Sequence, residues 1–180
     1  MMEFLRISTP ANGFGTGPAP WKHDPGALHD RDAIELAKFL VGYTGTPEQC
    51  FFGVWEGYGY FSVGSAFILS ADGGVPLSPP PEIQSAELFE CDDWKYYLYG
   101  GPLASLGNFF ANDRFWGDTP NIWWPADRAW FVMSHYDLDC TYVAGSDECI
   151  QNLLQHLSFE VIPIAANAPY GWGQDQINLP

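Results

Sequence analysis

Two segments of the chain repeat apolar side chains at the spacing of an amphipathic helix. The first predicted helix runs from Asp32 to Tyr43 and begins with Asp32 and Glu35, a pair typical of a capping box. Its apolar stripe consists of Ala33, Ile34, Ala37, Leu40 and Val41. The second predicted helix follows Ser146, the expected N-cap, and its apolar stripe consists of Ile150, Leu153, Leu154 and Leu157. A short third helix is predicted over Pro102–Leu106, because proline loses no hydrogen bond in a first turn.

Most other apolar runs are short and have the length of β-strands. The predicted strands are Cys50–Trp55, Tyr60–Leu69, Ser85–Glu90, Trp94–Tyr99, Ala129–Tyr136, Cys140–Val143 and Phe159–Ile164. Residues 71–81 contain prolines that oppose ladder pairing and are predicted to form a loop. Residues 115–128 are predicted to form an aromatic loop that leads into a two-stranded hairpin. The element order indicates an α+β fold, a mainly antiparallel sheet of about six or seven strands with two main helices.

Glycine and proline are concentrated near the two ends of the chain. Residues 1–26 are therefore predicted to be an irregular N-terminal arm, and residues 167–180 a C-terminal tail. Between them we expect a single α+β domain over residues 27–166. The 180 residues, of which 47% are hydrophobic, suffice for one core.

The charge balance narrows the choice of partners. The chain has 22 acidic residues against 7 Lys and Arg, for a formal net charge of −15. This charge repels phosphate backbones and anionic lipids, so nucleic acid and membrane surfaces are not expected partners. It favours a basic protein partner or a cationic small molecule, although a role in solubility explains it equally well. The sequence has no apolar run typical of a signal peptide or a membrane span, which predicts a cytoplasmic protein.

No cofactor or metal site is predicted from the cysteine and histidine pattern. The four cysteines contain no CxxC pair and are interpreted as structural thiols. In a straight strand, His135, Asp137 and Asp139 would share one face and could hold a divalent metal. The favoured alternative is that the two aspartates form a hairpin turn, in which they cap backbone amides.

Three motifs resemble an uncharacterised family of bacterial proteins that is associated with actinobacterial genomes. They read TPEQCFFGVWEGYG, YYLYGGPL and PNIWWPADRAWFV followed by DLDCTYVAGS, and they span most of residues 44–146. The chain departs from the family pattern at His135, where an acid is common, and at Ala144, where glycine is common. The resemblance implies a shared fold and carries no catalytic residue, because the family has no assigned activity.

Two groups of side chains form the predicted binding site. The densest group of acids comprises Glu87, Glu90, Asp92 and Asp93, followed by Trp94 as a contact aromatic. The second group comprises Trp123, Trp124 and Arg128, where a guanidinium among rings can clamp a carboxylate or stack. The alternatives are a solvated hairpin end for the first group, and a turn in which Asp127 caps amides for the second.

No catalytic residue is predicted, because no motif specifies a reaction. Glu56 among aromatic rings has the surroundings of a general acid, but a carboxylate in a glycine turn more often caps amides. Two function classes follow. The first is a small acidic binding protein, of the immunity or antitoxin type, that engages a cationic protein. The second is an enzyme or ligand binder with a pocket lined by Trp55, Trp123, Trp124 and Trp130.

Overall fold

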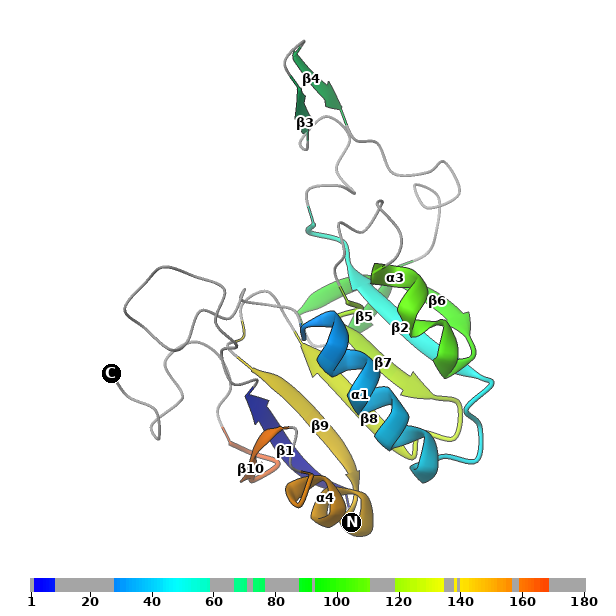
Figure 1. Cartoon of the computed structure of the whole chain (residues 1–180), viewed down its shortest axis with the longest axis vertical. Helices are drawn as coiled ribbons and strands as arrows, with labels where there is room; N and C mark the ends of the chain where they lie inside the picture. The colour runs from blue at the N-terminus through cyan, green and yellow to red at the C-terminus, as the bar shows by residue number, and fades with distance from the viewer. Residues whose placement is uncertain are drawn as a thin grey trace, which may run out of the picture.

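The main body of the protein is one eight-stranded antiparallel sheet with helices packed against it. The computed structural model of the chain describes residues 2–8, 28–58, 67–70, 73–76, 88–91, 93–110, 119–134, 138, 140–156 and 159–168. The strand order in the main sheet is β10-β1-β9-β8-β7-β2-β6-β5 (Figure 1). The strands are β1 (Met2–Ser8), β2 (Cys50–Trp55), β5 (Phe89–Cys91), β6 (Trp94–Gly101), β7 (Ile122–Pro125), β8 (Trp130–Ser134), β9 (Thr141–Ser146) and β10 (Glu160–Ile164). The predicted mixture of helices and an antiparallel sheet is confirmed, but the sheet has more strands than predicted.

Two strands of the main sheet were not expected from the sequence. β1 pairs with β9 and β10, so the irregular structure predicted for residues 1–26 is wrong for residues 2–8. β7 pairs with β2 and β8, so residues 122–125 are a strand and not part of an aromatic loop. Both strands lie inside the sheet, where each has a neighbour on either side.

A separate two-stranded sheet lies within the segment that was predicted to hold one strand and a loop. Strand β3 (Phe67–Ser70) pairs with β4 (Gly73–Pro76). The loop predicted for residues 71–81 is therefore wrong for residues 73–76. Pro76 is the last residue of β4, a position at which the missing N–H removes little from the ladder.

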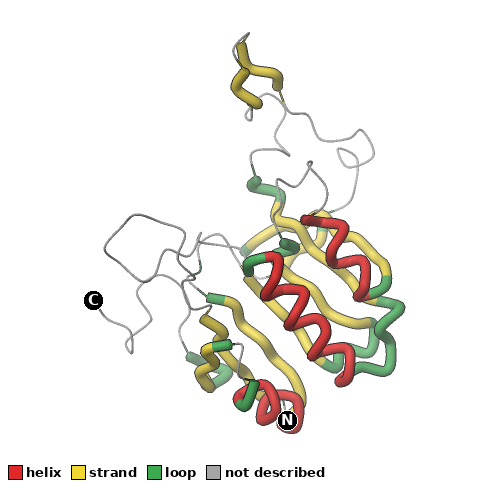
Figure 2. Tube along the Cα trace, in the orientation of Figure 1, coloured by secondary structure: helices red, strands yellow, loops and turns green. Residues whose placement is uncertain are grey.

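The helices cover one face of the main sheet. They are α1 (Asp30–Leu40), which continues into the 3₁₀ turn η1 (Val41–Tyr43), η3 (Leu103–Leu106) followed by α3 (Gly107–Phe110), and α4 (Asp147–Leu154). Figures 1 and 2 show α1 and α3 lying over the near face of the sheet and α4 beside β9 and β1. The core between the layers contains Leu36 and Leu40 of α1, Leu106 of η3 and Leu153 of α4, all almost fully buried.

Trp130 of β8 joins the sheet to α1. Its Nε1–H donates a hydrogen bond of 3.0 Å to the backbone carbonyl of Leu40, and the side chain is fully buried. The indole ring meets that of Trp123 edge to face, with 5.4 Å between centroids. The carbonyl of Leu40 is near the end of α1, where helix carbonyls lack intrahelical partners, so this bond satisfies one of them.

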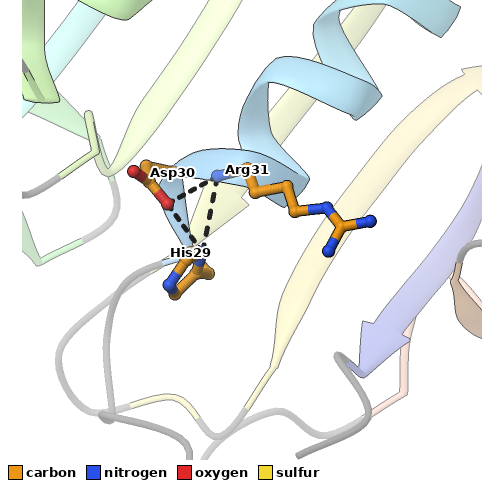
Figure 3. Close-up of polar contacts among 3 residues, drawn as sticks. All are labelled: His29, Asp30 and Arg31. Atoms are coloured by element: carbon orange, nitrogen blue, oxygen red, sulfur yellow. Dashed lines mark hydrogen bonds and ion pairs between the residues drawn. The ribbon is translucent and has the colours of Figure 1, made fainter. Parts of the chain in front are cut away.

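The N-terminus of α1 differs from the predicted capping box. The N-cap is His29, and α1 begins at Asp30, two residues before the expected start. Figure 3 shows the contacts: Asp30 Oδ1 accepts a 2.7 Å hydrogen bond from the Arg31 N–H and lies 2.7 Å from His29 Nδ1. His29 Nδ1 is 3.4 Å from the same N–H. The shorter distance identifies the Asp30 carboxylate as the main acceptor, and a carboxylate there also complements the helix dipole.

The N-cap predicted for the second helix, α4, is confirmed. Ser146 is the N-cap of α4, and its Oγ accepts a hydrogen bond of 3.3 Å from the Cys149 N–H. Asp147 and Glu148 lie in the first turn, where negative charge complements the helix dipole. Leu157 of the predicted stripe lies outside the described residues.

Asp127 ties the turn between β7 and β8 to the loop before β2. Its carboxylate accepts hydrogen bonds from Thr44 Oγ1 at 2.9 Å, the Gly45 N–H at 2.7 Å and the Ala129 N–H at 3.1 Å. Its own N–H donates to Thr46 Oγ1 at 3.1 Å. Desolvation alone would raise the pKa of the Asp127 carboxyl, but these hydrogen bonds outweigh it and hold the pKa below the ordinary 3.8. The carboxylate form of Asp127 thus stabilises this corner.

We expect Asp127→Asn to lower the free energy of unfolding at pH 7 by about 1 kcal/mol, the usual size of a lost cap. Because the pKa of Asp127 is lower in the folded chain, its contribution is complete above pH 3.8 and is lost as the pH falls through the folded value. The difference between wild type and variant should therefore shrink in acid. Urea unfolding at several pH values measures it. Glu48→Gln, an exposed neighbour in the same loop, is the control and should change little.

Candidate functional site

The face of the sheet opposite the helices carries a row of aromatic rings. Successive side chains of a strand point to opposite faces, so Phe131 faces away from α1 because its neighbour Trp130 faces it. Trp124 lies between Phe131 on β8 and Phe51 on β2, with ring centroids 5.8 and 5.5 Å apart. The three rings are tilted by only about 30° from one another and are half-buried.

Phe89 extends this row to the end strand of the sheet. Its ring centroid is 5.4 Å from that of Trp124, although the two residues belong to β5 and β7. Phe89 is 37% exposed, and Leu98 on the adjacent strand β6 is 40% exposed. We call Phe51, Phe89, Leu98, Trp124 and Phe131 the aromatic surface.

The described part of the predicted acidic group lies directly beside Phe89. Glu90 of β5 is exposed, and Asp93 is exposed in the tight turn to β6. The half-buried Trp94 pairs with Cys91 at the start of β6. Glu87 and Asp92 lie outside the described residues. Through Phe89, Trp124 thus reaches the strand that carries Glu90, although the Glu90 side chain lies on the other face of the sheet.

Lys95 partly offsets this negative charge. Its Nζ is 3.4 Å from Glu90 Oε1, and both side chains are about half exposed or more. Glu90 on β5 and Lys95 on β6 are directly opposite each other in the sheet. An exposed pair of this kind contributes little stability, so Glu90 remains available to a partner with a stronger positive field.

The tryptophans proposed for a common pocket lie in two different layers. Trp123 and Trp130 are almost fully buried in the core beneath the helices, and they contact each other. Trp124 is on the opposite face, in the aromatic surface, and Trp55 packs edge to face on Tyr58 at 5.6 Å. Trp123 was predicted as a binding residue, but at 1% exposure its ring belongs to the core.

Arg128 occupies the turn between β7 and β8. It is exposed, and its φ of 56° places the backbone in the left-handed region, which a non-glycine residue adopts only at a cost. Its N–H donates to the Pro125 carbonyl at 2.9 Å, which closes the turn. The predicted alternative, a turn capped by Asp127, is confirmed.

Asn121, a fully buried polar residue that organises this region, was not singled out from the sequence. Its Oδ1 accepts a hydrogen bond from the Trp55 N–H at 2.8 Å, and its Nδ2 donates to the Tyr58 hydroxyl at 3.0 Å. These bonds fix the turn that follows β2 and contains the half-buried Glu56. Trp55 lies against Gly57, where an added Cβ would approach its ring to 2.2 Å. The Trp55 ring can therefore pack on this turn only because residue 57 is a glycine.

Two of the thiols are buried, and no metal cluster is found among the described residues. Burial raises the pKa of Cys50 and of Cys149 to about 11, so both thiols stay protonated near neutral pH. Among the residues that the structure describes, no group of three His, Cys, Asp or Glu side chains could hold a metal ion. His135, Asp137 and Asp139 lie outside that part.

Within the same described ranges, no helix is long and apolar enough to cross a membrane. Comparisons of the chain with family models, curated proteins and solved structures find no match in any of the three.

Proposed function

We propose that the protein is an acidic binding protein that engages a cationic protein partner through the aromatic surface and the adjacent acidic hairpin. The contact between Phe89 and Trp124 supports this proposal, because it extends the row of rings to the edge strand that also carries Glu90, next to the turn with Asp93. A partner with arginine or lysine side chains can contact both the aromatic surface and the acidic hairpin. The cations stack on ring faces and pair with Glu90 and Asp93.

The net charge of −15 supports the same class of partner at longer range. A strongly acidic protein attracts a basic one before contact, which raises the association rate by ten- to a thousandfold at low salt. Inhibitors of the immunity or antitoxin type, which neutralise a basic protein in the cytoplasm, have this combination of charge and binding surface, and we propose this role for the chain.

The test is a quantitative pull-down from a lysate of the native cells at low and high salt, with the tagged chain as bait. We expect the bait to capture a basic protein that high salt releases. The association rate of this protein with the double variant Glu90→Lys, Asp93→Lys should be about tenfold lower than with the wild type. The matched control is the double reversal Glu48→Lys, Glu160→Lys, which changes the charge equally at exposed sites outside the proposed surface.

The ring contribution is tested separately with Trp124→Ala. This variant should speed dissociation and leave the on-rate nearly unchanged, because rings act at contact and charges act at a distance. Equal effects of the two charge-reversal variants would show that only net charge matters, and would contradict a localised surface.

A further inference from the structure

β5 is the last strand of the main sheet on its acidic side. Among the strands that the structure describes, it is paired with β6 alone, and it is three residues long. The strand at the opposite edge, β10, contains Pro163, which has no N–H to offer to a further strand. The two edges of the sheet therefore differ in chemistry.

The hydrogen bonds of β6 show which of its backbone groups reach β5. The Glu56 N–H donates to the Lys95 carbonyl at 3.0 Å, so Lys95 directs its backbone groups toward β2. The backbone groups of successive residues point to opposite sides of a strand. Those of Trp94 and Tyr96 are therefore directed toward β5.

The register then fixes the direction of the backbone groups of β5. Tyr96 is opposite Phe89, Trp94 is opposite Cys91, and Lys95 is opposite Glu90. Phe89 and Cys91 use their N–H and C=O groups on β6, and those of Glu90 point away from the sheet. The 3.4 Å ion pair of Glu90 with Lys95 agrees with this, since side chains approach most closely at pairs without backbone hydrogen bonds.

The two faces of this edge carry opposite kinds of side chain. Phe89 lies in the aromatic surface, on the same face as Leu98, which is two residues beyond the partner of Phe89 on β6. The side chain of Glu90 points to the other face. Of the four large apolar side chains that are exposed in the described part, Phe89 and Leu98 lie here. Short, charged edges also serve to block strand addition, but protection needs the charge alone and leaves two exposed apolar side chains unexplained.

From this geometry we propose that the partner adds an extended segment to β5 as a ninth, edge strand of the sheet. The proposal rests on the proposed function and specifies how its partner binds. The segment alternates apolar and basic residues: the apolar ones cover Phe89 and Leu98, and the basic ones pair with Glu90 on the other face. Its backbone bonds to the outward N–H and C=O of Glu90.

The direct test is amide exchange at Glu90, measured by NMR on the wild-type chain. The probe is a blocked hexapeptide of alternating valine and lysine, with a peptide of the same composition in two blocks as control. We expect the alternating peptide to slow exchange of the Glu90 amide at least tenfold, and the block peptide to leave it unchanged. Exchange of the Tyr96 amide, which is already paired within the sheet, should change little.

Two substitutions separate the backbone contribution from the charge. Glu90→Pro removes the outward N–H and the charge but spares the bonds of β5 to β6, whereas Glu90→Gln removes only the charge. We expect the proline variant to bind the alternating peptide about tenfold more weakly than the glutamine variant. Protection of the Tyr96 amide in the proline variant verifies that β5 and β6 stay paired.

The outcomes distinguish this inference from the function on which it rests. If both peptides bind while the Glu90 amide exchanges as fast as before, or if the two variants weaken binding equally, strand addition is wrong and the acidic–aromatic surface stands. If the lysine peptides fail to bind even at low salt, and reversal of Glu90 and Asp93 leaves partner capture unchanged, the proposed function fails as well.

Discussion

Trp130→Ala should lower the free energy of unfolding by about 4 kcal/mol, the largest effect expected of any single substitution considered for this chain. The indole is fully buried, contacts Trp123 and donates to the Leu40 carbonyl, so its removal leaves a cavity and an unpaired carbonyl at the end of α1. Urea unfolding followed by far-UV circular dichroism measures the loss.

Trp130→Phe divides this effect into two parts. Phenylalanine retains most of the apolar volume but cannot donate to Leu40, so we expect a loss of about 1.5–2 kcal/mol. Trp124→Ala is the matched control, because it removes the same side chain from the half-buried aromatic surface. A cost for Trp124→Ala as large as that for Trp130→Ala would show that the core is not where the structure places it.

Asn121→Ala should lower the free energy of unfolding by about 3 kcal/mol, because it removes both side-chain hydrogen bonds that Asn121 makes to the turn after β2. The Trp55 N–H and the Tyr58 hydroxyl would each lose a part-buried hydrogen bond, and a buried polar group left without a partner costs about 1–3 kcal/mol. Denaturant unfolding and the near-UV signal of the tryptophans report the change. A loss under 1 kcal/mol would mean that water replaces the amide readily.

Asn121→Asp tests the same site through pH. The new carboxyl would be buried, and burial favours the neutral acid and raises its pKa above the unfolded value. The variant should therefore be most stable in acid and lose stability as the pH rises above about 4, where the unfolded carboxyl ionises. A stability difference from wild type that is independent of pH would show that the position is hydrated.

The sequence predicted the elements whose two sides differ in polarity. α1 and α4 have an apolar stripe against the sheet and a polar outer side, and this pattern locates both helices. The predicted boundaries of β2 are the observed ones, because Pro47 and Gly57 bracket a short apolar run.

β7 was missed for the converse reason. Trp123 packs in the core beneath the helices, whereas Trp124 lies in the aromatic surface and Ile122 is fully buried on that same side. A strand with apolar side chains on both faces has no alternation, so its sequence resembles an apolar loop. β1 was missed because it is followed by a segment rich in glycine and proline, whose composition was extended to its neighbours.

The predicted site residues differ in their accessibility. Glu90 and Asp93 are exposed and Trp124 is half-buried, as contact with a partner requires, whereas Trp123 is buried. Alternation alone separates Trp123 from Trp124 once β7 is known to be a strand. The meeting of Phe89 with Trp124 depends on strand order and sheet curvature, and neither is encoded in local pattern. The role of Asn121 depends in the same way on partners far along the chain.

The position of β1 between β9 and β10 has a consequence for synthesis. Leu5 is opposite both Val143 and Pro163, so β1 must wait for partners that are synthesised much later. Pairing over so great a separation in sequence closes a long loop and slows folding. Until β9 emerges from the ribosome, β1 has no strand partner, and chaperone capture of this strand at that stage would limit how much of the protein aggregates.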